Sequence, residues 1–415
     1  MNKIDNKITI ITSGYFPVPA AMGGAVEALD ENIMKQNELS NKLDLTIFSC
    51  FNHDAKIQAE KYKNTRVEFI QIPLIIQQVD KLLYLFAKNI LKKEKSMSYR
   101  YILQRLYYIR KVAKKINKDD YGKLVIENHS TLFMILKKYN NYKKYEGRYY
   151  YHLHNVVVND YGCKNIIANC KSVLGVSNYI NRTLKEFLGK EDNNNYFVLK
   201  NKIDQRKFRI NIKQERKDEL RRRFNLDSSD KIVLFTGRFT HEKGIKELLL
   251  AFKKINHENV KLLIVGGYYF GSGMVSKFES EMRELALSME DKIIFTGFIE
   301  YNMIPELYAL ADIVVIPSIW DDPAPLTVVE SLTAGKALIT TYSGGIPEYT
   351  NENSSILLKR DENLISLLSE KIDYLLDNPD VVDNMEEAVL GMTESWNLEK
   401  FYTDFCDLLE VGQVR

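Results

Sequence analysis

The sequence predicts an α/β protein built from two doubly wound, Rossmann-like domains. Short β-branched runs alternate with stretches of helical periodicity along the chain, which is the pattern of parallel strands joined by helices. Several of these runs lead into glycine-containing loops, where the backbone can approach a ligand at the carboxyl edge of a sheet. A length of 415 residues suits two such domains better than one.

The first domain, residues 1–200, begins with the strand KITIIT at Lys7–Thr12. A loop with two prolines then leads to Gly23 and Gly24, and helical spacing follows them. The two glycines therefore stand where a helix N-terminus can meet an anion, and a flexible surface loop is the alternative. Further strands are expected at Asp44–Ser49, Val67–Ile70, Lys123–Glu127, Tyr149–Leu153 and Ser172–Val176.

The charge of the chain is unevenly distributed. Residues 1–200 carry 32 Lys and Arg against 19 Asp and Glu, whereas residues 201–415 carry 26 against 36. The most basic stretch is Lys81–Lys118, with 12 Lys and Arg against one acid, Glu94. A basic half indicates an anionic surface or substrate facing the first domain.

The second half of Lys81–Lys118 predicts an amphipathic helix. Its apolar residues recur at spacings of four and three, at Ile102, Leu106, Ile109, Ala113 and Ile116. This stripe either packs on its own domain or rests on an anionic membrane surface. Tyrosines between the charges would also permit stacking on bases, but we expect no nucleic acid partner.

Two histidines follow the predicted strand Tyr149–Leu153, in the sequence YYYHLHN. His152 and His154 point to the same side if the strand continues that far. No acidic or cysteine cluster accompanies them in the sequence, and no D-x-D motif occurs, so we expect no bound metal. A hydrogen-bonded structural histidine is the alternative for each.

The second domain, residues 201–394, opens with a strand at Lys231–Thr236. Gly237 and Arg238 follow it directly, and Lys243 precedes a helix. Arginine offers a bidentate fork, lysine a point charge and the helix N-terminus free amides, which together can hold a diphosphate without a metal. The alternative is ordinary surface charge.

The most informative stretch is PSIWDDPAPLTVVESLTAGKALITTYSGGIPE, from Pro317 to Glu348. It predicts a buried strand at Asp312–Ile316, a helix that Thr327 and Glu330 begin as a capping box, a second strand and a glycine loop. Asp322, Glu330 and several free backbone amides should therefore lie along one carboxyl edge.

The spacing of these acids resembles a known family. Asp322 and Glu330 bracket seven residues, as in the Glu-seven-Glu motif of family-4 glycosyltransferases, although Asp322 replaces the first Glu. Other segments match the family pattern in its usual order: Gly237-Arg238, Lys243-Gly244 and Gly344-Gly345-Ile346-Pro347-Glu348. The resemblance implies the GT-B arrangement, in which two Rossmann-like domains face each other across a cleft. It also implies that residues 395–415 return as a helix to the first domain.

The resemblance further implies roles for individual residues. Glu330 would accept hydrogen bonds from the ribose hydroxyls. Phe298 and Ile299 would pack on the base, and His154 would lie beside the donor sugar. The implied catalytic residues are His154, Arg238, Lys243 and Asp322. The implied donor-binding residues are Gly23, Gly24, Gly237, Arg238, Lys243, Phe298, Ile299, Asp322, Leu326, Thr327 and Glu330.

The implied activity is that of a retaining, metal-independent hexosyl- or N-acetylhexosaminyltransferase. It would move a sugar from a nucleotide diphosphate sugar, a UDP-sugar in particular, to a glycan or lipid-linked acceptor in cell-surface polysaccharide synthesis, with no cofactor. Two alternatives stay open: a sugar-nucleotide epimerase of the same fold, and a degenerate subunit that supports an active partner.

The sequence also gives an expectation for where the protein works. No run approaches the roughly 20 apolar residues that span a bilayer, and the first residues lack a signal-peptide core. The four cysteines have no C-x-x-C spacing, which fits reduced thiols. We therefore expect a cytoplasmic protein that binds peripherally to the inner face of the cell membrane through Lys81–Lys118.

Overall fold

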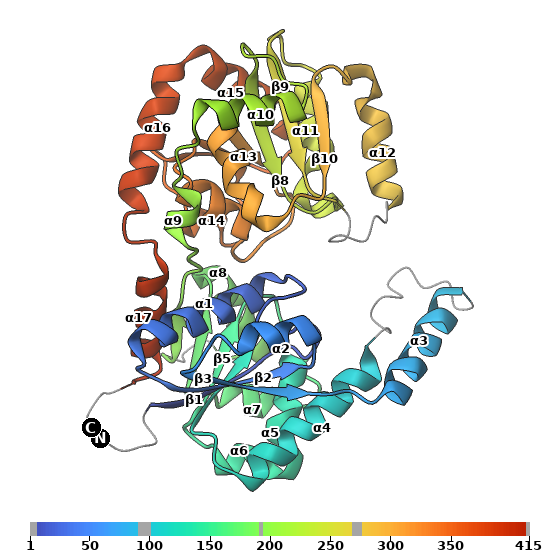
Figure 1. The fold of residues 1–415 in the computed structure, drawn as a ribbon, viewed down its shortest axis with the longest axis vertical. Coiled ribbons are helices and arrows are strands. Elements are labelled where there is room, and N and C mark those ends of the chain that lie inside the picture. Colours follow the sequence, from blue (N-terminus) through green and yellow to red (C-terminus); the bar gives the residue numbers. More distant parts are fainter. Residues whose placement is uncertain (1–5, 90–100, 191–193, 268–275, 412–415) are drawn as a thin grey trace. The chain divides into compact units, whose positions relative to one another are not determined.

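A computed structural model describes residues 6–89, 101–190, 194–267 and 276–411. The chain divides into two compact units. Unit 1 comprises Met1–Lys200 and Phe401–Arg415, and unit 2 comprises Asn201–Lys400. Each unit is a parallel sheet covered by helices (Figure 1), so the predicted fold class of two Rossmann-like domains is confirmed.

The described strands of unit 1 form one seven-stranded parallel sheet in the order β3-β2-β1-β4-β5-β6-β7. They are β1 (Lys7–Ile11), β2 (Asp44–Cys50), β3 (Thr65–Ile70), β4 (Lys123–Glu127), β5 (Tyr149–Leu153), β6 (Ser172–Gly175) and β7 (Tyr196–Val198). The order reverses between β1 and β4, and the carboxyl ends of these two strands mark the switch point where α/β sheets bind ligands. We call it the unit 1 switch point.

The principal helices of unit 1 are α1 (Ala25–Ser40), α2 (His53–Ala59), α3 (Leu74–Asn89), α4 (Ile102–Lys118) and α8 (Asn178–Leu188). Shorter α-helices are α5 (Met134–Lys137), α6 (Asn141–Lys144) and α7 (Lys164–Ala168). The last helix, α17 (Leu398–Leu408), places Phe401 and Phe405 in the same core as Ile8 and Ile10 of β1. Residues at the end of the chain thus complete the core of its first unit.

Helices α3 and α4 form a pair that extends from the sheet of unit 1 (Figure 1). The carboxylate of Asp80 in α3 is buried. It accepts hydrogen bonds of 2.9 Å each from the first amides of α4, those of Leu103 and Gln104. The α4 residues Tyr108, Ile109, Val112, Ala113 and Ile116 are buried. The second half of the predicted stripe therefore packs on its own domain, whereas part of Lys81–Lys118, residues 90–100, lies outside the described residues.

The described strands of unit 2 form a parallel sheet in the order β10-β9-β8-β11-β12-β13. They are β8 (Lys231–Thr236), β9 (Val260–Val265), β10 (Ile293–Gly297), β11 (Ile313–Ile316), β12 (Leu338–Thr341) and β13 (Ser355–Leu358). The order reverses between β8 and β11, whose carboxyl ends form the unit 2 switch point.

The helices of unit 2 pack on both faces of this sheet, and each face has its own hydrophobic core. They are α9 (Gln205–Phe208), α10 (Gln214–Arg223), α11 (Ile245–Phe252), α12 (Lys277–Ala286), α13 (Ile304–Leu310), α14 (Leu326–Thr333), α15 (Leu364–Asp377) and α16 (Pro379–Met392). Strand residues alternate between the cores: Val233 and Phe235 face one, and Ile232 and Leu234 face the other. Both sides of the sheet are thus buried.

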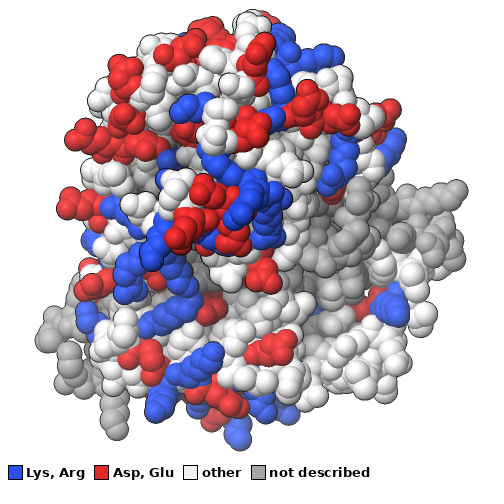
Figure 2. All heavy atoms as spheres, turned by 45° about the horizontal axis from the view of Figure 1, so that its top comes forward, with Lys and Arg blue, Asp and Glu red and all other residues white. Residues whose placement is uncertain are grey.

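Surface charge is mixed on the face drawn in Figure 2, where Lys and Arg lie among Asp and Glu. The charge difference between the two halves of the sequence is therefore not a continuous field of one sign on that face. Within the described part of the chain, every helix is too short or too polar to cross a bilayer.

Candidate functional site

At the unit 2 switch point, a glycine brings two loops into contact. Gly244 begins α11 with φ of 69°, and a Cβ there would lie 1.9 Å from the carbonyl oxygen of Pro317. Only glycine accepts both this conformation and this approach. The loop after β8 therefore lies directly against the loop after β11, which brings Lys243 beside Asp322.

Lys243 and Asp322 form an ion pair with 2.7 Å between Nζ and Oδ2. Both side chains are largely buried, with 17% and 18% of their surface exposed. The sequence assigned them to different parts of a donor, the phosphates and the sugar, and the structure joins them. A lysine ammonium has three N–H donors, so two remain for a ligand after one meets Asp322.

The glycine loop after β12 holds the loop that carries Asp322. The amide of Gly344 donates to Asp321 Oδ1 at 3.0 Å, and the amide of Gly345 donates to the Asp322 carbonyl at 2.9 Å. A Cβ on Gly344, whose φ is 53°, would lie 2.3 Å from that carbonyl oxygen. The prediction that these amides are free for a ligand was wrong, because they fix the backbone of the acidic loop.

Glu330 occupies a different position from the one that the capping box predicts. Helix α14 begins at Leu326 with Pro325 as its N-cap, and no side chain caps it. The prediction of Thr327 as the cap was therefore wrong: Pro325 has a φ of −65°, and the helix begins immediately after it. Glu330 instead lies in the second turn, buried against the core of unit 2.

The carboxyl of Glu330 meets two tyrosines. Burial raises the pKa of Glu330 to about 7, and hydrogen bonds from Tyr301 and Tyr308 partly offset this. Tyr308 Oη lies 3.4 Å from Oε2. Near neutral pH this carboxyl is thus poised between its two protonation states, and its oxygens face hydroxyl donors.

The other predicted donor residues of unit 2 lie on the loops and helix ends around this edge. Arg238 is exposed directly after Gly237 and β8, and no contact in the described part of the chain joins its guanidinium to Lys243 or Asp322. Phe298 is 52% exposed, whereas Ile299 is buried in the core. Leu326 and Thr327 are partly exposed in the first turn of α14.

In unit 1 the predicted glycines precede α1, as the sequence suggests. Gly24 is the N-cap, with φ of 108°, and a Cβ there would lie 2.3 Å from Glu27 Oε2. Burial raises the pKa of Glu27 to about 7, opposed by its own backbone amide and by the hydroxyl of Ser13, which donates to Oε1 at 2.9 Å. The N-terminal turn of α1 therefore faces a carboxyl of its own. The Cβ position of Gly23 is open.

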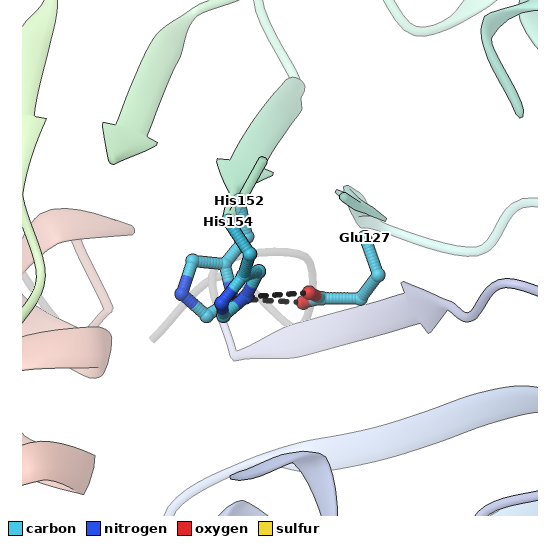
Figure 3. Close-up of side chains that lie close together, drawn as sticks. All are labelled: Glu127, His152 and His154. Carbon is cyan, nitrogen blue, oxygen red and sulfur yellow. Dashed lines mark hydrogen bonds and ion pairs between the residues drawn. The ribbon is translucent and has the colours of Figure 1, made fainter. Parts of the chain in front are cut away.

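Glu127, His152 and His154 form a buried cluster at the same edge of the unit 1 sheet (Figure 3). Glu127 ends β4 and pairs in register with His152 of β5. Glu127 Oε1 lies 3.0 Å from His152 Nδ1, and Oε2 lies 3.4 Å from His154 Nε2. The two histidine nitrogens are 3.3 Å apart. The carboxylate thus faces one nitrogen of each ring.

The protonation of this cluster follows from its burial. Burial alone would raise the pKa of Glu127, but His152 and His154 lower it to about 2. Burial and His152 lower the pKa of His154 to about 4, although Glu127 opposes this. Burial and the nearby carboxyls of Glu127 and Glu27 raise the pKa of Asp30. At neutral pH Glu127 is therefore ionised and His154 is neutral.

The expectation that no acid accompanies the two histidines was wrong. Glu127 reaches them across two parallel strands, a contact that the local sequence around YYYHLHN does not show. Within the described residues, these three side chains are the one group whose types and spacing could hold a metal ion. The cluster lies in unit 1, and the Lys243–Asp322 pair lies in unit 2.

Comparison with known proteins finds similarity to glycosyltransferases. Residues 216–390 match the family model described as glycosyl transferases group 1. The chain is 25% identical over 391 residues to the putative glycosyltransferase YtcC of Bacillus subtilis, covering 91% of this chain and 85% of that protein. Over 140 residues, 33% of this chain and 37% of the relative, it is 30% identical to the lipopolysaccharide 1,2-N-acetylglucosaminetransferase of Salmonella typhimurium.

A solved structure supports the fold. Anabaena HepE in complex with UDP and glucose superposes with a TM-score of 0.70 at 17% identity, covering 97% of this chain and 99% of that one. The resemblance that the motifs indicate, to glycosyltransferases of the GT-B fold and to bacterial cell-surface polysaccharide enzymes among them, is thus confirmed.

Proposed function

We propose that this chain, a glycosyltransferase of group 1 by the match of residues 216–390, moves a hexosyl or N-acetylhexosaminyl group from a UDP-sugar to a glycan or lipid-linked acceptor. The observation that carries the proposal is the Lys243–Asp322 pair, which places a desolvated cation and a carboxylate at the switch point of unit 2. HepE, which shares the fold, has been solved with UDP and with glucose, and this supports UDP as the nucleotide.

The pair and Arg238 suit a sugar diphosphate in three ways. Lys243 keeps two N–H donors for phosphate oxygens and is held in place by Asp322 before the donor arrives. Asp322 Oδ1 faces the Ala324 amide at 3.4 Å, so that the second oxygen of the carboxylate is only weakly engaged and can accept from a sugar hydroxyl. Arg238, exposed after β8, adds a second cation for the departing diphosphate.

The mechanism that we propose is retaining and needs no metal. Charge that grows on the leaving diphosphate is stabilised by Lys243 and Arg238, which is the main demand when the leaving group is a nucleotide. Glu330 accepts hydrogen bonds from the ribose hydroxyls, and Phe298 packs on the base of the nucleotide. In unit 1, neutral His154 is the residue that the family resemblance assigns to the donor sugar. Because Glu127 and His152 occupy its Nε2, the nitrogen that is left for a substrate is Nδ1.

The acceptor side of the proposal includes an anionic membrane surface. In α3 an apolar face is exposed at Ile75, Val79, Leu82 and Phe86, which share one side of the helix by their spacing of four, three and four. Twelve cations within Lys81–Lys118 complement an anionic bilayer. We therefore assign membrane contact to α3 rather than to the α4 stripe, and we propose a peripheral protein at the inner face of the cell membrane.

The decisive experiment is to screen nucleotide sugars by thermal shift and then to follow the donor that binds by NMR. A ligand at 100 times its dissociation constant stabilises by about 2.7 kcal/mol. We expect a UDP-sugar to bind, a product of unchanged anomeric configuration, and a rate that excess EDTA leaves unchanged. An isomerised donor in the absence of acceptor would identify an epimerase, and failure to bind any nucleotide sugar would identify a non-catalytic subunit.

A further inference from the structure

The unit 1 switch point contains an arginine that has no anionic partner among the described residues. Arg105 of α4 extends to Tyr15, four residues beyond the end of β1, and Nη1 donates to the Tyr15 hydroxyl at 2.7 Å. Its guanidinium lies 4.3 Å from the centre of the Tyr15 ring. Nε and Nη2 are shielded from solvent and have no hydrogen-bond acceptor in the described residues.

The surroundings of Arg105 are aromatic and neutral. Tyr15 contacts both Tyr101 of the segment before α4 and His129, two residues beyond β4, with ring centres 5.7 and 5.8 Å apart. Tyr161, in the loop after β5, lies close enough to interact with the charge of Arg105. Burial, Arg105 and His154 lower the pKa of His129 to about 3, so His129 is uncharged at neutral pH. Loops after β1, β4 and β5 thus meet around one cation.

An unpaired buried cation is costly. Arginine cannot lose its proton in a protein, so a desolvated guanidinium normally has a carboxylate or other acceptors for its donors. The ionised carboxylate at the end of β4, Glu127, faces His152 and His154 instead. Stacking on Tyr15 recovers only part of the lost hydration. Such a group is expected where a ligand supplies the missing anion.

We infer that Arg105 is the centre of an anion subsite in unit 1 that takes the phosphate or diphosphate group of the acceptor. The planar fork of Nε and Nη2 matches two oxygens of one phosphate. The surrounding tyrosines offer faces for a sugar ring. Tyr161 is 48% exposed, so its side chain can move aside for the ligand without opening the core.

The position of Arg105 relative to α3 indicates a lipid-linked phosphate. Asp80 of α3 holds the amides of Leu103 and Gln104, the two residues directly before Arg105, so the exposed apolar face of α3 and this cation are parts of one rigid corner. An acceptor with a prenyl chain can therefore rest its chain on α3 and its diphosphate on Arg105. This step rests on the proposed function, which supplies the acceptor class.

The test measures binding to the full chain saturated with UDP, so that the donor site is occupied. Inorganic pyrophosphate and farnesyl diphosphate in detergent are titrated by calorimetry into the wild type, Arg105→Gln and the matched control Arg110→Gln, an exposed arginine of the same helix. We expect Arg105→Gln to weaken both ligands by roughly tenfold or more, and Arg110→Gln to leave both unchanged. Leu82→Ser should weaken farnesyl diphosphate alone, which separates a lipid-linked phosphate from a free one.

Three outcomes would overturn the inference. Equal binding of pyrophosphate by wild type and Arg105→Gln removes the subsite. Weaker UDP binding in Arg105→Gln assigns the cation to the donor instead. A lower melting temperature of Arg105→Gln with unchanged pyrophosphate affinity shows a purely structural arginine, whereas we expect equal or greater stability once an unpaired charge is removed. If UDP itself does not bind, the proposed function fails, and the titrations without UDP still decide the role of Arg105.

Discussion

The two switch points of this chain have the same topology and opposite electrostatics. At the end of β8 and β11, Lys243 is paired with Asp322 at 2.7 Å. At the end of β1 and β4, the carboxylate of Glu127 contacts two histidines, and Arg105 has no anionic partner in the part of the chain that the structure describes. Two parallel sheets that reverse their order in the same way thus present one neutralised cation, Lys243, and one cation, Arg105, without a counter-charge among the described residues.

The difference teaches how each site is prepared for its ligand. In unit 2 the ion pair holds Lys243 in place before a ligand binds. A diphosphate therefore meets an ammonium group that is already positioned to donate hydrogen bonds, and little reorganisation is needed. In unit 1 burial and His152 keep His154 neutral, Glu127 is ionised beside it, and Arg105 is the cation that lacks an anionic partner among the described residues. The comparison predicts that unit 2 variants change turnover, that the unit 1 cluster governs stability, and that Arg105 governs acceptor affinity.

The largest expected effect comes from the unit 2 pair. Lys243→Ala should lower kcat by a factor of roughly 100 to 1,000, the size expected when one preorganised charge contact to the leaving group is lost. Lys246→Ala, an exposed lysine in the first turn of α11, is the control and should be near normal. Steady-state rates with the donor identified by thermal shift measure this. A Lys243→Ala enzyme within threefold of wild type would remove the phosphate assignment.

The sequence predicts those parts of the site that depend on local patterns of residues. Gly237, Arg238 and Lys243 follow a strand and precede a helix, and such punctuation is visible in a single sequence. The ion pair of Lys243 with Asp322 spans 79 positions, and the contact of Glu127 with His152 spans 25 across registered strands. Local periodicity and spacing do not indicate contacts between residues so far apart in the chain. These contacts form only when the sheet assembles.

Two of the misplaced features, the capping box and the free glycine amides, have the same cause. The capping box at Thr327 and Glu330 has the right spacing, but Pro325 starts the helix earlier and burial turns Glu330 toward Tyr308. The exposed face of α3 was not predicted, although the apolar spacing from Ile75 to Phe86 is present in the sequence. The glycine amides of the β12 loop were predicted to be free because their partners, the Asp321 side chain and the Asp322 carbonyl, come from another loop.

The next largest effect is expected at the unit 1 cluster of Glu127, His152 and His154, whose charge we expect to stabilise the fold. Glu127 has a folded pKa near 2 against an ordinary value of 4.5, so its contribution is complete above pH 4.5 and is lost as the pH falls toward 2. Glu127→Gln should lower the free energy of unfolding at pH 7 by about 3 kcal/mol, with less difference at pH 3. Denaturant unfolding at both pH values measures it, with exposed Glu146→Gln as control.

A loss of stability that is the same at pH 7 and pH 3 would contradict this assignment. It would show that Glu127 acts through packing rather than through its charge, and the contrast between the two switch points would then lose its electrostatic basis.

A smaller effect of opposite sign is expected at Glu330. Its folded pKa is raised to about 7, so the unfolded carboxyl ionises first and stability falls as the pH rises from 4.5 to 7. Glu330→Gln should therefore melt at a higher temperature than wild type at pH 8, with the gain vanishing near pH 5, while UDP affinity falls roughly tenfold. Exposed Glu362→Gln should do neither. Unchanged UDP affinity would leave Glu330 with a structural role only.

The smallest effect concerns the membrane, and it tests whether the cation of unit 1 lies where a lipid-linked ligand can reach it. Each Lys or Arg near an anionic surface contributes about 1 kcal/mol, over a Debye length of about 8–10 Å. The protein should sediment with anionic vesicles, dissociate as salt rises, and ignore neutral vesicles. Reversing Lys111 and Lys114 to Glu should weaken this; Lys115 is left intact because it pairs with Glu68 at 2.8 Å.

The apolar part of that contact has its own variant. Replacing Leu82 and Phe86, which are 65% and 50% exposed on α3, with serine should reduce sedimentation without lowering the melting temperature, because neither side chain belongs to the core. Leu39→Ser, at an exposed leucine of α1 in the same unit, should sediment like wild type. If the α3 variant sediments normally and the charge reversal does not, lipid binding is electrostatic alone, and α3 cannot be the surface that presents a prenyl chain to Arg105.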